Sequence, residues 1–204
     1  MPVLPPLNLA AFVRDNRHLL KPPVGNRMIW EDTQFKGTET SPAFLAAARY
    51  ASTGSLPDVH NSAPFVSGPW AFSLNGYVVG FRDGFGAELR SRISEQRVAG
   101  IEGNTDSEVL FALVLDRLDA GASPGEALVA VTRLVRSRSE GALNLLLGDD
   151  RHIAATALDN SLFVRREPGL IVASEPLDDD GTWTEVDNGS LVENDRISPI
   201  GGLP

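Results

Sequence analysis

Hydrophobic positions in the middle of the chain follow the spacing of two half-buried helices. Residues 104–107 offer several capping side chains in front of the first apolar run, which predicts a helix over residues 107–119. Gly121 interrupts the pattern, and Pro124 suits the first position of a second helix over residues 125–136.

Short apolar runs separated by turn residues predict strands on both sides of these helices. The strands expected after the helices cover residues 142–147, 152–157, 161–165 and 170–174, with a weak strand near 190–192. Before the helices, Trp70–Leu74 alternates large and small residues and is followed by Asn75–Gly76, a strong turn signal. Residues 70–81 are therefore predicted to form a hairpin, whereas periodicity leaves the run 44–49 ambiguous between strand and helix.

The first 27 residues have a different character, with five prolines around one apolar stretch. That stretch, residues 9–20, predicts a helix with Asn8 as its N-cap. We therefore expect an atypical segment over residues 1–27 and a single domain over residues 28–204. Strands, then two helices, then an antiparallel meander indicate an α+β fold with layered sheets.

Composition excludes several classes of function. The net charge of −9 and the pI near 4.8 argue against binding to nucleic acid, which needs clustered Lys and Arg. No apolar run approaches the roughly 18 residues that span a bilayer, and no secretory signal is evident, so the interpretation is a cytoplasmic protein without a membrane partner. The 204 residues include no cysteine, which excludes disulfides, cysteine-based metal sites and a thiol nucleophile.

The remaining metal-binding and acid–base residue types do not form a convincing site. The histidines, His18, His60 and His152, are isolated from one another in sequence, and we assign none of them a catalytic role. Asp178–Asp180 is interpreted as a solvated loop, since three adjacent carboxylates cannot all face one ion. We expect neither a metal nor a cofactor.

Five stretches, in this order, resemble the class II glutamine amidotransferases, which are N-terminal-nucleophile proteins. The nearest group is the γ-glutamyl hydrolases of bacterial ergothioneine biosynthesis. The stretches are Ala48–Gly54, Trp70–Gly76, Thr105–Glu108, Leu143–Leu147, and Ala173–Asp180 with Trp183. The resemblance covers roughly residues 28–192 and implies an α/β/β/α sandwich of antiparallel sheets, incomplete at its N-terminus.

The resemblance also implies a site for a γ-glutamyl amide, either glutamine or a compound of the γ-glutamyl-hercynylcysteine sulfoxide type. Arg49 would bind the α-carboxylate through its planar guanidinium, and Asp106 would bind the α-ammonium. The side-chain amide of Asn75 and the backbone N–H of Gly76 would form the oxyanion hole. The alternatives are a surface arginine at Arg49, a plain type I′ turn at Asn75–Gly76, and a simple helix N-cap at Asp106.

The nucleophile of the family is a cysteine directly after the initiator methionine, whereas Pro2 occupies that position here. Proline has no side-chain nucleophile, so this chain is expected to be inactive by itself. Leu74 replaces the histidine that usually precedes Asn-Gly. The family's Asp-Gly-(Phe/Trp)-Gly segment should precede Arg49, so the similar string at residues 83–86 is taken as a coincidence.

Three explanations of the missing nucleophile remain open: a truncated gene model, a binding-only relative that has lost catalysis, or a separate chain that contributes the missing N-terminal strand. A lost strand would leave one sheet with an unpaired edge or a gap. A different class, the tautomerases, uses an N-terminal proline such as Pro2 as a general base, but those proteins are much shorter.

Overall fold

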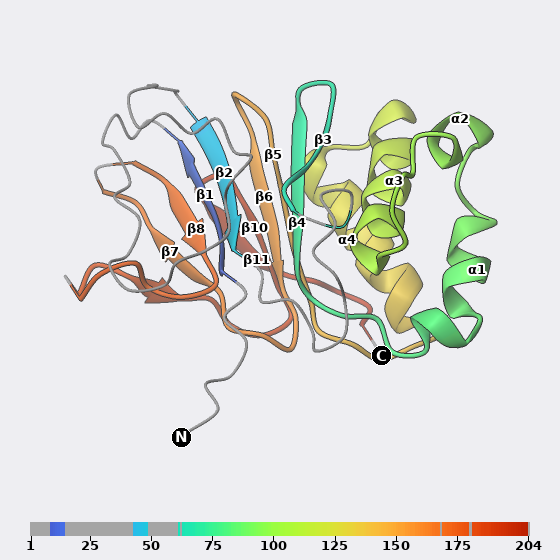
Figure 1. The fold of residues 1–204 in the computed structure, drawn as a ribbon. Helices are drawn as coiled ribbons and strands as arrows, with labels where there is room; N and C mark the ends of the chain where they lie inside the picture. Colours follow the sequence, from blue (N-terminus) through green and yellow to red (C-terminus); the bar gives the residue numbers. More distant parts are fainter. Residues whose placement is uncertain are drawn as a thin grey trace, which may run out of the picture.

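The computed structural model describes residues 9–14, 43–48, 61, 63–167, 169–179 and 181–203. Two antiparallel sheets lie face to face, and the helices pack against the outer face of one of them (Figure 1). This arrangement confirms the predicted α+β sandwich of antiparallel sheets. Among the described residues, no helix has the length and apolar character needed to cross a bilayer.

The six-stranded sheet carries the residues of the candidate site. Its strand order is β11-β10-β6-β5-β4-β3, and every neighbouring pair is antiparallel. The strands are β3 Phe65–Ser67, β4 Trp70–Gly76, β5 Leu143–Gly148, β6 Ile153–Ala157, β10 Ser190–Glu193 and β11 Arg196–Pro199. The predicted strands after the helices are therefore present in this sheet as β5, β6 and β10.

The five-stranded sheet has the order β2-β1-β8-β7-β9. Its strands are β1 Leu9–Arg14, β2 Ala43–Ala48, β7 Phe163–Arg165, β8 Ile171–Ala173 and β9 Thr184–Glu185. The strands predicted at 161–165 and 170–174 are present as β7 and β8. The ambiguous run 44–49 is resolved as strand β2.

The predicted helix over residues 9–20 is wrong, because residues 9–14 form β1. This strand pairs with β2 on one side, from Leu9↔Ala48 to Arg14↔Ala43, and with β8 on the other. Ladder hydrogen bonds on both edges outweigh the weak helical periodicity of a short apolar run. Since β1 is an interior strand of the described sheet, no gap separates β2 from β8, and β2 lies at the edge of this sheet. The expected gap is therefore not present among the described strands, and the unpaired edge stays a prediction.

The helical layer contains both predicted helices. Its members are η2 Phe81–Asp83, α1 Phe85–Arg90, α2 Glu95–Val98, α3 Asp106–Asp119 and α4 Pro124–Arg136. A capping box closes the start of α4, where Ser123 accepts from the Glu126 amide and the Glu126 carboxylate accepts from the Ser123 amide. The short elements β3, β9, β11, α1 and α2 were not predicted.

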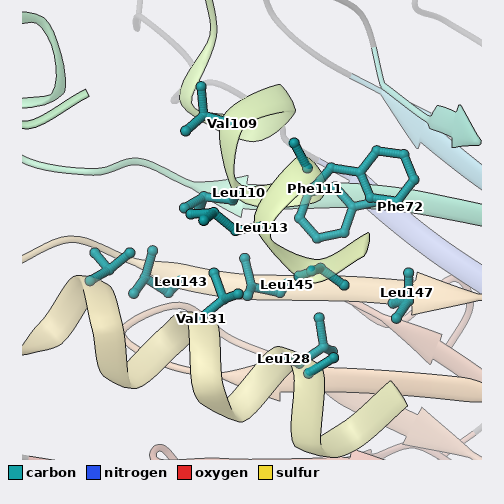
Figure 2. Close-up of a cluster of buried hydrophobic side chains, with 14 of the residues drawn as sticks. Phe72, Val109, Leu110, Phe111, Leu113, Leu128, Val131, Leu143, Leu145 and Leu147 are labelled. Atoms are coloured by element: carbon teal, nitrogen blue, oxygen red, sulfur yellow. The ribbon is translucent and has the colours of Figure 1, made fainter. Parts of the chain in front are cut away.

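The core has two parts, one on each face of the six-stranded sheet. Between sheet and helices, Phe72 of β4 lies against Phe111 of α3, as Figure 2 shows. The two rings are stacked, with their centroids 5.1 Å apart. Leu145 of β5 faces this cluster, whereas Leu146 belongs to the cluster between the two sheets. Both faces of β5 are therefore buried, which accounts for its nearly uninterrupted apolar sequence.

The hairpin predicted over residues 70–81 is also wrong. The hairpin partner of β4 is the preceding strand β3, and Gly68 lies in the turn between them with φ +58°. Asn75 and Gly76 continue β4 and pair with β5 through Asn144 and Leu143. An Asn-Gly pair permits a tight turn but does not require one, and pairing with the buried β5 takes precedence here.

Candidate functional site

The end of β4 and the start of α3 meet at one place in the structure. The backbone N–H of Val78 donates a hydrogen bond of 3.0 Å to Oδ2 of Asp106. Val78 lies two residues beyond Gly76, so this bond brings Asp106 beside the end of β4. Three of the four predicted site residues, Asn75, Gly76 and Asp106, therefore belong to neighbouring backbone segments.

Asp106 is the first residue of α3, and it is not the N-cap. Thr105 is the N-cap, and its hydroxyl accepts from the Glu108 amide at 3.3 Å. Oδ1 of Asp106 accepts from the Ser107 amide at 2.9 Å, so both carboxylate oxygens have backbone donors. The simple N-cap alternative is therefore wrong, and the carboxylate is held in a fixed orientation.

Glu108 secures the loop that leads into α3. The side chain is buried, and Oε1 accepts from the backbone amides of Glu102 and Gly103 at 3.2 and 2.9 Å. A carboxylate in the first turn also interacts favourably with the helix dipole. The start of α3, including Asp106, is thereby tied to the preceding residues.

Gly76 is required where it stands because the backbone of the neighbouring strand approaches closely. A Cβ atom at this position would lie 1.8 Å from the carbonyl oxygen of Ala142. The next residue, Tyr77, donates its N–H to the same oxygen at 2.9 Å. The alternative of a type I′ turn at Asn75–Gly76 is therefore wrong. Glycine is needed here because the neighbouring backbone leaves no room for a side chain.

A network of asparagines holds the end of β4. Asn160 donates from its side chain to the carbonyl oxygen of Asn75 at 2.9 Å. Asn144, opposite Asn75 in the ladder, is 3 % exposed and donates to the carbonyl oxygens of Asn160 and Ser161 at 3.1 and 2.9 Å. Its own side-chain oxygen accepts from the Leu158 amide at 2.7 Å.

Sequence reasoning missed the role of Asn144, although a signal for it was present. A single asparagine inside the apolar run Leu143–Leu147 is unusual, because a buried amide must find hydrogen-bond partners. Leu74, which replaces the expected histidine, packs as a half-buried member of the core beside the helices. At this position the chain therefore has a packing residue in place of a polar one.

Arg49, the fourth predicted site residue, lies outside the described residues. The strand β2 ends at Ala48, directly before it. Both β1 and β2 approach β4 across the interface between the two sheets. The strand β2 therefore packs against the strand that carries Asn75.

Arg165, Asp178 and Trp183 form a second cluster of polar contacts. Asp178 pairs with Arg165 at 2.6 Å and accepts from the Trp183 indole N–H at 2.9 Å. The Arg165 guanidinium also lies over the Trp183 ring, 4.7 Å from its centroid. These contacts fix the loop after β8, so Asp178 is ion-paired and not simply solvated. Within the described residues, no group of three or more His, Asp or Glu is arranged to hold a metal ion.

His152, one of the three histidines, takes part in the turn between β5 and β6. Its Nδ1 lies 3.0 Å from Oδ1 of Asp149, which also accepts from the backbone amides of Arg151 and His152 at 2.8 and 2.6 Å. Burial by itself would raise the pKa of Asp149, but these hydrogen bonds and the His152 side chain hold it below its ordinary value. Asp149 therefore stabilises a turn and has no evident part in the candidate site.

Comparison with known proteins gives two close matches in sequence. The chain is 30 % identical over 173 residues to the γ-glutamyl-hercynylcysteine sulfoxide hydrolase of Mycolicibacterium smegmatis, covering 82 % of this chain and 68 % of that protein. It is 31 % identical over 170 residues to the protein of the same name from Mycobacterium tuberculosis, covering 81 % and 65 %. The chain thus spans about two thirds of the length of these relatives. No model of a protein family matches it.

Solved structures agree on the fold. A glutamine aminotransferase class-II domain protein from Silicibacter pomeroyi superposes with a TM-score of 0.64 at 24 % identity, covering 92 % of this chain and 93 % of that one. The glutamine phosphoribosylpyrophosphate amidotransferase of B. subtilis superposes with a TM-score of 0.63 at 19 % identity, covering 95 % of this chain and 43 % of that one.

A further match is short. Thirty residues are 57 % identical to part of the 3-hydroxyanthranilate 3,4-dioxygenase of Xanthomonas oryzae, covering 15 % of this chain and 17 % of that protein. A match of that length does not make the chain a dioxygenase.

Proposed function

Because this chain belongs to the class II glutamine amidotransferase family, we propose that it binds the γ-glutamyl part of a small-molecule amide. The proposed site lies between the end of β4 and the start of α3. The observation that carries the proposal is the hydrogen bond from the Val78 amide to Asp106, which joins these two segments.

Asp106 is proposed to bind the α-ammonium of the glutamyl group. A carboxylate suits that task only if its position is fixed, and backbone amides hold both of its oxygens. Arg49 is proposed to bind the α-carboxylate, since a guanidinium matches a carboxylate with two parallel hydrogen bonds.

Asn75 and Gly76 are proposed to form the oxyanion hole. Their donors would act on the charge that develops when the amide is attacked, and much less on the bound ground state. Pairing with β5 and the Asn160 hydrogen bond hold the backbone at Asn75 in place. That rigidity fits the preorganisation an oxyanion hole needs.

The favoured ligand is a compound of the γ-glutamyl-hercynylcysteine sulfoxide type, because two relatives carry the name of that hydrolase. Glutamine is the second candidate, since the structural neighbours include glutamine-dependent proteins.

We propose that these 204 residues, by themselves, bind such a ligand without hydrolysing it. They include no cysteine, and the chemistry of the family depends on a thiol. A binding or regulatory role is one form of this proposal. The other form is a second chain that supplies the nucleophile.

Calorimetric titration with L-glutamate, together with a glutamate-release assay on a γ-glutamyl amide, tests the proposal. Arg49→Ala should abolish binding, whereas Asn75→Ala should change it much less, because the oxyanion hole acts on the transition state. Arg117→Ala, at an exposed arginine, is the matched control for loss of one guanidinium. Rapid glutamate release would contradict the proposal and would point to a hydroxyl nucleophile such as Ser52 or Ser73.

A further inference from the structure

A pocket opens beside the start of α3, next to the proposed glutamyl site. Its volume is about 470 Å³, within the range of small-molecule sites. It lies between the segment η2–α1 and the loop that leads into α3. The lining residues are Phe81, Arg82, Gly86, Ala87, Arg90 and Asn104.

One side of the pocket is formed by the close packing of Gly86 against Phe81. Gly86 is buried, and a Cβ atom there would lie 2.5 Å from the Phe81 carbonyl oxygen and 3.0 Å from its ring. A side chain at residue 86 would therefore displace Phe81. The Phe81 ring and the helix α1 are therefore in close contact.

Two arginines line this pocket, and neither forms an ion pair with the described part of the chain. Most other arginines there do pair with a carboxylate, as Arg97 does with Asp119 at 2.6 Å and Arg136 with Asp159 at 3.0 Å. Arg90 makes one long contact, 3.5 Å from the Gly103 carbonyl oxygen, and is half-buried. In a chain with a net charge of −9, two such cations facing one pocket indicate an anionic ligand.

Two segments of backbone link the lining of the pocket to the proposed glutamyl site. Asn104, at its edge, stands two residues before Asp106, and two residues of chain span at most about 7 Å. On the other side, the Phe81 amide bonds to the Val78 carbonyl oxygen at 3.3 Å, and the Val78 amide bonds to Asp106. A ligand bound by Asp106 would therefore lie near this pocket, within reach of a group on its amine side.

We propose that Arg82 and Arg90 bind a carboxylate carried by the amine-side part of the γ-glutamyl compound. This inference rests on the proposed function. An amino acid joined through its nitrogen to the γ-carbonyl of glutamate keeps its own α-carboxylate, and cysteine-containing γ-glutamyl compounds do so as well. The two arginines thus select γ-glutamyl amides of amino acids over γ-glutamyl amides of simple amines.

Two ligands that differ in this carboxylate measure its contribution to binding. γ-Glutamylalanine and γ-glutamylethylamide share the γ-glutamyl part and a two-carbon chain, but only the former has a second carboxylate. Titration of the 204-residue protein should show about tenfold tighter binding of γ-glutamylalanine, which corresponds to one partly screened charge-assisted contact. Arg82→Ala and Arg90→Ala should each reduce this preference at least threefold and leave the affinity for γ-glutamylethylamide unchanged.

Two variants serve as controls. Arg117→Ala removes an exposed arginine near the opposite end of α3 and should keep the full preference. Arg90→Lys retains the charge and should keep part of the preference, and circular dichroism verifies that each variant folds. Equal binding of the two ligands by the unmodified protein, or a preference unchanged in both alanine variants, would overturn this inference alone. If the unmodified protein binds neither ligand nor glutamate, the proposed function fails and the inference falls with it.

Discussion

Replacing Asn144 by leucine should destabilise the protein strongly, because it removes the centre of the network that supports the end of β4. The side chain makes three hydrogen bonds, to the Leu158 amide and to the carbonyl oxygens of Asn160 and Ser161. Leucine has a comparable size but no polar atoms, so the change is chiefly a loss of these bonds. The partner groups would have to find water or remain unpaired.

The size of the expected loss of stability depends on how deeply each hydrogen-bond partner of Asn144 is buried. Leu158 is buried, and an unpaired buried N–H costs about 1–3 kcal/mol. Asn160 and Ser161 are exposed, so their carbonyl oxygens can rehydrate, and each lost bond costs about 0.5–1.5 kcal/mol. We expect a total near 3 kcal/mol, or a fall in Tm of about 6–12 °C for a protein of this length.

Urea unfolding followed by circular dichroism measures this change directly. The matched control is Asn160→Ala, which removes one exposed hydrogen bond to Asn75 and should cost less than about 1 kcal/mol. A loss below about 1 kcal/mol for Asn144→Leu would contradict this expectation, because it would mean that the network contributes little to the position of β4.

Three further changes test the fold. Phe72→Ala should cost about 3–5 kcal/mol in urea unfolding, because it empties a fully buried site and removes the stacking on Phe111; a cost under 1 kcal/mol would contradict the described packing. Ser123→Ala removes the capping box of α4 and should lower the free energy of unfolding by about 1 kcal/mol in the same assay. An unchanged free energy of unfolding would contradict this expectation. Asp149→Ala should destabilise at neutral pH, and the difference from the unmodified protein should shrink only as pH falls below the ordinary pKa of 3.8, since the folded pKa is lowered. Unfolding curves from pH 7 to pH 3 measure that difference, and a difference that disappears already above pH 5 would contradict it.

The helices were predictable because their signals are local. The caps before Asp106, the proline at residue 124 and the regular apolar spacing all act within one segment, and both helices are present. The later strands were predictable for the same reason, since turn residues separate each apolar run from the next. Resemblance to a family then supplied the layered arrangement, which local patterns do not contain.

The predictions were wrong where the structure of a segment depends on residues far away in the sequence. Residues 9–14 form a strand because β2 and β8 flank them, and nothing in their own sequence shows this. Asn75–Gly76 stays in β4 because β5, almost 70 positions later, pairs with it. Likewise, the sequence pointed to Asp106 through a short signature, but its bond to Val78 depends on the packing of α3 against β4.

The claim that Asp106 belongs to a γ-glutamyl site can be tested most directly by titrating L-glutamate into the unmodified protein and into Asp106→Asn. Asparagine keeps one acceptor oxygen for the backbone amides but loses the charge that pairs with an ammonium. We expect measurable binding to the unmodified protein and about tenfold or greater loss of affinity in the variant, both proteins being folded by circular dichroism. Equal affinity for the two proteins would contradict it.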